Sequence, residues 1–211
     1  MPLPSTLRSL TDTGAKEESN VTEQPTDGET PPWPAGEPDD SEPTPERQME
    51  LRAAYDANMK VGKPPYAGVI IRTRGEVKWI VRERGWKTGG AEILAEFIDL
   101  RRVGFDQANL SGTDLSLANL SGAVITYANF TSADLSLANL SGVAITGTNF
   151  TSAKLGLANL SGAIISPANF TNANLFAANL SGAVIIGNFS KATLVRARMD
   201  ATAMLVHSQD R

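Results

Sequence analysis

The chain has 211 residues, of which 41% are hydrophobic, and a formal net charge of −4. It contains no cysteine and one histidine, which excludes a disulfide framework, thiolate chemistry and zinc sites built from Cys and His. No stretch approaches the ~20 apolar residues of a membrane span, and the N-terminal sequence lacks the apolar centre of a signal peptide. We therefore expect a cytoplasmic protein that does not contact membranes.

The N-terminal region, residues 1–44, is predicted to be a disordered tail. Residues 1–49 contain eleven acidic side chains against three basic ones, together with most of the prolines of the chain. Such a segment cannot bury enough apolar surface to offset the conformational entropy lost on folding. Trp33 is the only aromatic residue in this region, and we interpret it as incidental rather than as a docking anchor.

Residues 45–90 are predicted to form a small α/β module. Thr44, followed by a proline, provides a cap and a first turn for a helix that continues to about Lys60. The sequence GKPP ends this helix, and the next segment, YAGVIIR, has the composition of a short strand.

Two further helices are expected before the repeats begin. Thr73 and Glu76 form a capping-box signature for a helix that ends near Gly85. A third, amphipathic helix over residues 91–100 is predicted to cap the open end of the structure that follows, since a repeat array needs its terminal apolar surface covered.

The segment 60–87 is basic and has aromatic residues interspersed, a combination that favours nucleic-acid binding. The alternative is a basic surface that faces solvent or pairs with the acidic tail of the same chain. We favour this alternative, so nucleic acid is not the expected ligand. The residues that would carry nucleic-acid binding are Arg72, Arg74, Lys78, Arg82, Arg84 and Lys87.

A five-residue period dominates the second half of the chain. From Phe105 to Ile185, every fifth residue is Leu, Ile or Phe, and the residue two positions earlier is small, most often Ala. A spacing of five matches neither a helix nor a strand, so it predicts a repeat structure of another kind. A longer period of twenty residues is also visible, and its last copy is one residue short near Gly187. Beyond this slip the five-residue pattern continues through Phe189 to Met204.

The units DQANL, SLANL, TYANF, TSADL and TNANL resemble the A(D/N)LXX consensus of the pentapeptide repeat proteins, over residues 101–204. The resemblance implies a right-handed quadrilateral β-helix of about five coils, in which the periodic residue and the preceding Ala point inward. Asn or Asp before many periodic residues suits the corners, because these side chains bond to nearby backbone. We thus expect an all-β solenoid, preceded by the small α/β capping module and followed by a short tail at 205–211.

Catalytic signatures are missing from the sequence. His207 lies near the C-terminus, and there is no GxSxG, P-loop or GxGxxG motif. Asp114, Asp134 and Lys154 would stack at twenty-residue spacing, but on a face open to solvent, where no unusual pKa is expected. We therefore expect a protein without catalytic residues, metal, cofactor or small-molecule substrate.

The resemblance also raises topoisomerase modulation, because some pentapeptide repeat proteins imitate duplex DNA and bind type II topoisomerases. A rod about 24 Å long would need on the order of fourteen acidic residues to match the charge of DNA. Residues 105–194 contain three. Gyrase modulation by DNA mimicry is therefore an alternative rather than the leading hypothesis.

Two stripes of outward-facing apolar residues are predicted on opposite sides of the solenoid. One stripe consists of Leu117, Leu137, Leu157 and Phe176. The other consists of Val124, Tyr127, Ala144, Ile164, Val184 and Ile186. Apolar patches of this kind usually mark contact surfaces. We expect the module to cover one stripe and a protein partner or a second copy of the chain to bind the other, which makes the protein a non-catalytic scaffold.

Overall fold

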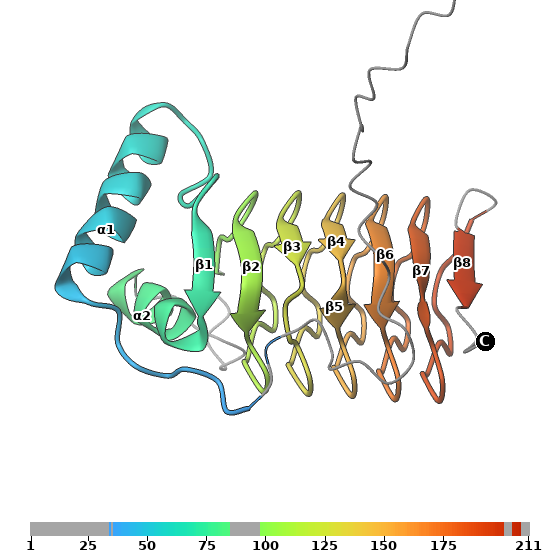
Figure 1. The fold of residues 1–211 in the computed structure, drawn as a ribbon. Helices are drawn as coiled ribbons and strands as arrows, with labels where there is room; N and C mark the ends of the chain where they lie inside the picture. Colours follow the sequence, from blue (N-terminus) through green and yellow to red (C-terminus); the bar gives the residue numbers. More distant parts are fainter. Residues whose placement is uncertain (1–33, 35, 85–97, 201–203, 208–211) are drawn as a thin grey trace, which may run out of the picture.

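The computed structural model describes residues 34, 36–84 and 98–200, and the backbone of 204–207. In Figure 1, two helices and a short strand lie at one end of a row of parallel strands. The end module consists of α1 (Pro45–Lys60), β1 (Ile70–Thr73) and α2 (Arg74–Arg84). The strands that follow are β2 (Gly104–Asn109), β3 (Val124–Thr126), β4 (Ala144–Thr146), β5 (Thr148–Asn149), β6 (Ile164–Asn169), β7 (Val184–Asn188) and β8 (Met204–His207).

The strands after the module are successive levels of a β-solenoid. Each pairs in parallel with the strand one coil further on, so that Gly104 lies beside Val124 and Val124 beside Ala144. The same step of twenty residues joins Ala144 to Ile164 and Ile164 to Val184. The predicted solenoid with four pentads per coil is therefore confirmed, with about four turns over residues 104–188.

The five-residue period fills the interior of the solenoid. All seventeen periodic residues from Phe105 to Ile185 are at most 2% exposed, and the small residues two positions earlier are buried as well. One row of the interior is aromatic, because every fourth pentad supplies a phenylalanine. Rings of Phe130, Phe150, Phe170 and Phe189 stack with neighbouring centroids 5.0 to 5.3 Å apart. Such contacts stabilise the core beyond the burial of their apolar area.

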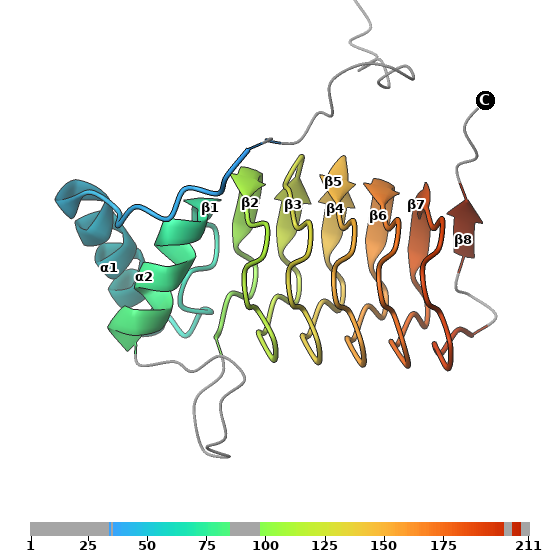
Figure 2. The ribbon, with the colours of Figure 1, turned by 90° about the horizontal axis from the view of Figure 1, so that it is seen from below.

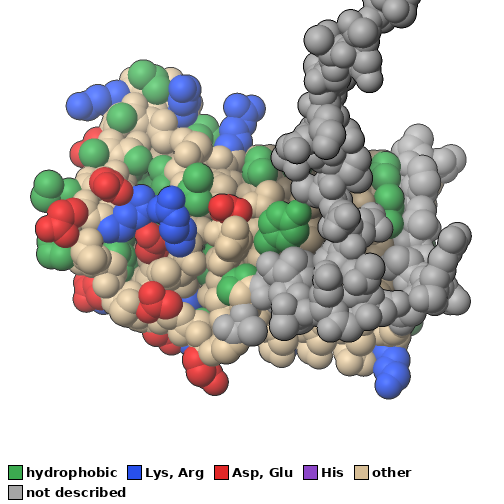
Figure 3. All heavy atoms as spheres, viewed as in Figure 1, with side chains coloured by type: hydrophobic (Ala, Val, Ile, Leu, Met, Phe, Trp, Pro, Cys, Tyr) green, Lys and Arg blue, Asp and Glu red, His purple; other side chains and the backbone are tan. Residues whose placement is uncertain are grey.

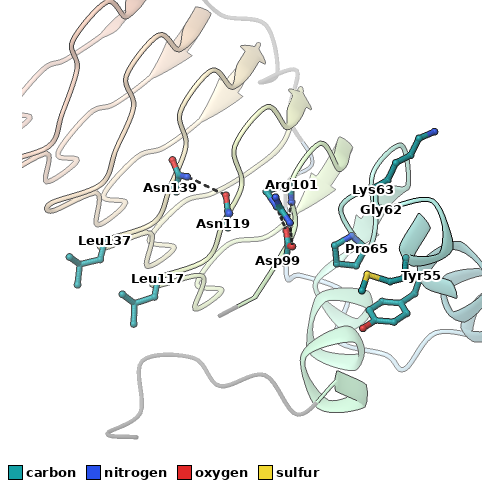
Figure 4. A pocket seen from close by; sticks show the side chains of 11 residues that line it. Tyr55, Gly62, Lys63, Pro65, Asp99, Arg101, Leu117, Asn119, Leu137 and Asn139 are labelled. Carbon is teal, nitrogen blue, oxygen red and sulfur yellow. Dashed lines mark hydrogen bonds and ion pairs between the residues drawn. The ribbon is translucent and has the colours of Figure 1, made fainter. Parts of the chain in front are cut away.

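The corners between pentads combine a left-handed residue with a side-chain hydrogen bond. Asn139, for example, accepts from the backbone N–H of Ser141 at 3.1 Å, which fixes the turn that follows Leu140. Its own amide donates to Asn119 of the preceding coil at 3.3 Å (Figure 4). The Asn positions that the sequence assigns to corners thus close the turns and also link successive coils.

The missing residue near Gly187 is absorbed as an irregularity between two strands. Ile165 pairs with Ile185, but three residues later Ala168 already pairs with Gly187. A Cβ at Gly187 would lie 2.3 Å from the Ala168 carbonyl oxygen, so this tightened position has no room for a side chain. The core resumes with Phe189, as expected, and Met199 keeps the register of Leu180, since Arg198 pairs with Asn179. Met199 is 52% exposed, because among the described residues no further coil packs on its side of the last one.

Local capping signals define the two helices. The hydroxyl of Thr44 accepts from the backbone N–H of Arg47 at 3.3 Å, and α1 runs over the predicted residues. In the same way Thr73 accepts from the N–H of Glu76 at 3.1 Å at the start of α2. The carboxylate of Glu76 then reaches back to the N–H of Arg72, one residue before the position that a capping box would use.

The module closes the N-terminal end of the solenoid. Strand β1 pairs with β2, with Ile70 beside Gly104 and Ile71 beside Phe105, so it adds one more level to the row. Val77 and Ile80 of α2 are buried in the same continuous core. Figures 1 and 2 show the module at this end from two directions. The expectation that the module covers an outward stripe is therefore wrong, since its described residues pack on the end of the solenoid and not on a side.

The predicted helix over residues 91–100 lies mainly outside the described residues. Those that are described, 98–100, already follow the coil. Asp99 forms a parallel bridge with Asn119, and Ile98 and Leu100 are buried in the core. In the described parts of the chain, neither helix is long and apolar enough to cross a membrane.

The inward register can be tested at one mid-solenoid pair. Leu140 is 1% exposed between coils on both sides, so Leu140→Ala should lower the free energy of unfolding by ~2 to 5 kcal/mol. Ser141→Ala, one residue further and partly exposed, should change it by no more than ~0.5 kcal/mol. Chemical denaturation measures both, and equal losses would show that the register is wrong.

Candidate interaction surfaces

Three leucines at one corner of the solenoid form the leucine ladder: Leu117, Leu137 and Leu157. Each is the second residue after a buried periodic position, and each has a left-handed backbone with φ of 64°, 61° and 60°. Their N–H groups donate to carbonyl oxygens of the next coil at 2.8 to 2.9 Å. The backbone that turns the corner therefore also holds the leucines in register, one above the other.

The left-handed conformation costs a leucine roughly 1 to 2 kcal/mol, whereas glycine adopts it freely. At the following corner, the same conformation is taken by glycines: Gly122, Gly142, Gly162 and Gly182. The fold thus accommodates glycine at this kind of position. Leu137 and Leu157 are moreover 53% and 55% exposed, so burial offsets only part of the strain. Neither the backbone nor the core of the described solenoid explains why leucine stands there.

Phe176 does not belong to the ladder register, in contrast to the prediction. Counting twenty residues from Leu157 leads to Ala177, which has the left-handed φ of 54°. Phe176 stands one residue earlier, and its carbonyl oxygen accepts from the N–H of Leu157 at 2.8 Å. Its ring is 38% exposed and lies 5.8 Å from the guanidinium of Arg196. The apolar corner therefore continues past Leu157, but with an aromatic side chain that is shifted by one residue.

The ladder leads into a groove where the module meets the solenoid. This groove has a volume of about 760 Å³, with Leu117 and Leu137 on one side and Tyr55 and Met59 of α1 on the other. Figure 4 shows the two leucines extending in the same direction from adjacent coils, across from the α1 side chains. Met59 is 51% exposed. No sequence pattern indicates this groove, because no periodic signal relates α1 to the coils.

The second predicted stripe is less continuous. Val124 and Ile164 are 52% and 63% exposed, but the smaller Ala144 separates them. Tyr127 lies over the next coil, since a Cβ at Gly147 would come within 2.4 Å of the Tyr127 ring. This tyrosine therefore packs on its own solenoid. The remaining members are half-buried: Val184 and Ile186.

Much of the predicted basic surface is engaged within the chain. Arg74, Lys78 and Arg82 form a cation row on α2, and two acidic residues of the preceding segment pair with it. Asp40 Oδ1 accepts a hydrogen bond from Arg74 Nε at 2.5 Å and lies 3.0 Å from Lys78 Nζ. Glu42 forms an ion pair with Arg82. Hydrogen bonds from Arg74 and Lys78 hold the pKa of Asp40 well below its usual range. The preferred interpretation of the basic segment, pairing with acidic residues of the tail, matches these contacts.

The other nucleic-acid candidates do not join the cation row. The guanidinium of Arg84 stacks 3.5 Å from the ring centroid of Tyr55 and donates to the Tyr66 hydroxyl at 3.3 Å. Arg72 is exposed on β1, and Lys87 lies outside the described residues. The structure therefore brings three of the six candidates together, and it brings them together with their own acidic partners.

A family model for pentapeptide repeats matches residues 105–142 and 144–182 in eight copies. Residues 105–182 therefore belong to the pentapeptide repeat family. Among solved structures, it is similar to HetL, a regulator of heterocyst differentiation from the cyanobacterium Nostoc, at 25% identity and a TM-score of 0.35. That match covers 46% of this chain and 54% of HetL. No match to a curated protein was found.

Two further solved structures match the chain. Rfr23 from the cyanobacterium Cyanothece is 30% identical, with a TM-score of 0.27, over 43% of this chain and 64% of Rfr23. QnrB1, a plasmid-mediated fluoroquinolone resistance protein, is 22% identical, with a TM-score of 0.30, over 50% of this chain and 67% of QnrB1. The chain thus spans between about half and two thirds of the length of these proteins.

The pentapeptide repeats of this chain carry few charges. Residues 105–194 contain three acidic residues and two lysines, and one pair of them is joined by the contact of Lys154 Nζ with Asp134 Oδ2 at 3.3 Å. Although partial burial raises the pKa of Asp134, hydrogen bonds from Ser136 and Lys154 lower it below the ordinary value, so this carboxylate stays ionised. In Figure 3 the coloured charges gather over the module end, and the visible solenoid is nearly free of them. Within the described residues, no group of three or more His, Cys, Asp or Glu could hold a metal ion.

The strain argument makes a prediction about stability. Leu137→Asn combined with Leu157→Asn should keep the free energy of unfolding within about 1 kcal/mol of the original, because Asn relieves the left-handed strain while half-exposed contacts are lost. Leu135→Asn is the control, since Leu135 is fully buried, and it should cost roughly 3 kcal/mol or more. Urea titration of the three proteins measures this. A large loss of unfolding free energy in the double variant would mean that the leucine ladder stabilises the fold.

Proposed function

We propose that this pentapeptide repeat solenoid is a non-catalytic interaction module that binds a protein through the leucine ladder and the adjoining groove. The observation that carries the proposal is the pair of strained and half-exposed leucines, Leu137 and Leu157, at a corner where glycine would fit. An exposed leucine forgoes part of the roughly 1.5 to 3 kcal/mol that full burial provides. A partner that covers the ladder supplies the missing burial.

The spacing of the solenoid suits a partner with regular side chains. Neighbouring coils are about 4.8 Å apart, so the ladder presents an apolar side chain at nearly constant intervals along the axis. The rows of an amphipathic helix, whose neighbours lie about 5 to 6 Å apart, approach this interval. The groove between α1 and the first coils extends the same apolar surface onto the module with Tyr55 and Met59. A second copy of the chain or another protein meets these requirements.

The proposal is tested by comparing matched substitutions on the two stripes. Leu137→Asn with Leu157→Asn should abolish partner cross-linking, or self-association in light scattering, while the protein remains folded. Val124→Asn with Ile164→Asn removes the same number of exposed apolar side chains from the other stripe and should leave the association unchanged. If the second pair abolishes association and the first does not, the ladder is not the binding surface.

Topoisomerase modulation by DNA mimicry, the alternative, finds no support in the charge of the solenoid. Residues 105–194 contain three acidic residues. A DNA duplex of this length carries on the order of fourteen negative charges. We expect that micromolar protein neither inhibits supercoiling by gyrase nor protects the enzyme from a quinolone. Protection in a supercoiling assay would require a mechanism that does not depend on a charged rod.

A further inference from the structure

The segment just before α1 binds across the module as an extended chain. Its acidic part, residues 39–42, we call the acidic strap. Asp40 contacts both Arg74 and Lys78 of the cation row, and Glu42 contacts Arg82. The row therefore holds two carboxylates with its three cations.

The geometry of the two elements matches. The cations of the row are four residues apart on a helix, which separates them by about 6 Å along the axis. Carboxylates two residues apart on an extended chain point to the same side and are separated by about 6.6 Å. A straight acidic chain with a carboxylate at every second residue thus fits the row without bending.

The module also contacts the peptide backbone of the strap. The N–H of Gly75 donates to the carbonyl oxygen of Asp39 at 2.8 Å. A Cβ at Gly75 would lie 1.8 Å from the Ser41 carbonyl oxygen, so the strap approaches α2 closely only because residue 75 is glycine. These contacts depend on peptide carbonyl groups, which a nucleic-acid strand does not have.

The solenoid extends the binding surface beyond the strap. The side-chain amide of Asn109 donates to the carbonyl oxygen of Gly36 at 3.0 Å, and that of Asn129 to the carbonyl oxygen of Pro34 at 3.1 Å. These asparagines are one coil apart, and their acceptors are two residues apart. The surface therefore contacts the backbone of this segment from α2 along the first two coils.

We propose that this surface is a receptor for an acidic peptide, and that residues 36–42 are its built-in ligand, which the acidic segment of a partner protein displaces. The contacts favour exchange, because the side chains of Asp40 and Glu42 remain 41% and 54% exposed. Ion pairs so open to water are weak and sensitive to salt. The tethered strap nevertheless excludes a free peptide at micromolar concentration, since a short tether gives an effective concentration of the order of millimolar.

The test uses full-length variants and a labelled peptide of residues 36–44, GEPDDSEPT, with blocked termini. Asp40→Asn with Glu42→Gln opens the row by removing charge from the strap. Gly75→Ala, added to these two substitutions, places a Cβ where the backbone of a bound chain would lie and should block the site. Fluorescence anisotropy should show that the opened variant binds the peptide at least tenfold more tightly than the wild type and than the variant with Gly75→Ala, with an affinity that falls as salt is added.

Matched controls locate the site. Asp39→Asn removes a carboxylate that accepts hydrogen bonds from Ser41 and not from the row, so it should behave as the wild type. Lys78→Gln with Arg82→Gln, added to the opened strap variant, should remove the gained affinity, whereas Arg72→Gln, which takes a cation from outside the row, should not.

Thermal melts verify that each variant is folded, and Asp40→Asn alone serves as the opened variant if the double substitution is not folded. The proposal is overturned if the opened variant does not bind the peptide. It is also overturned if the wild type binds as tightly as the opened variant, because the strap is then not a competitor. Tighter binding of a single-stranded oligonucleotide than of the peptide would assign the row to nucleic acid instead.

Discussion

The stacking of identical inward positions, twenty residues apart, is the constraint on which the rest of this structure depends. Leu140 lies one coil after Leu120 and one coil before Leu160, and all three are at most 1% exposed. Once the inward residues are in register, the outward residues are in register as well. A single leucine per coil then becomes a ladder and a single asparagine becomes a row of linked amides, so the solenoid multiplies whatever chemistry its repeat carries.

The same stacking leaves an open end of the solenoid that must be covered. The module that covers this end also determines where the cation row lies. The first coil would leave Phe105 and Leu110 open to water, and β1 and α2 cover this end with Ile71, Val77 and Ile80. Because α2 is fixed by its buried face, its polar face and the cation row are fixed as well. Arg74 links the strap, α2 and the solenoid, since it donates hydrogen bonds to Asp40 of the strap and to the carbonyl oxygen of Ser111 in the first turn of the solenoid.

The features that the sequence predicts well are those with a local or periodic cause. The inward residues, the twenty-residue coil, the slip at Gly187 and the caps at Thr44 and Thr73 are all visible in the order of residues. Counting twenty residues from Leu157 also leads to Ala177 and not to Phe176, so the twenty-residue period alone identifies the residue in register with the ladder. In contrast, the pairing of Ile70 with Gly104 joins segments without a common period. The sequence predicts a capping module, but no pattern in it shows how β1 pairs with the first coil or places α1 beside the leucine ladder.

The two surfaces differ in the physics of binding, and this difference follows from the distribution of charge. The ladder and groove lie on a solenoid with few charges, so association there depends on apolar burial and is little affected by salt. The cation row depends on ion pairs at partly exposed sites, which salt weakens. Both surfaces lie near the junction of module and first coils, because Leu117 lines the groove and Arg74 bonds Ser111. A partner with an apolar helix and an acidic extended segment would therefore meet both at one end of the solenoid, with salt acting on only one of the two contacts.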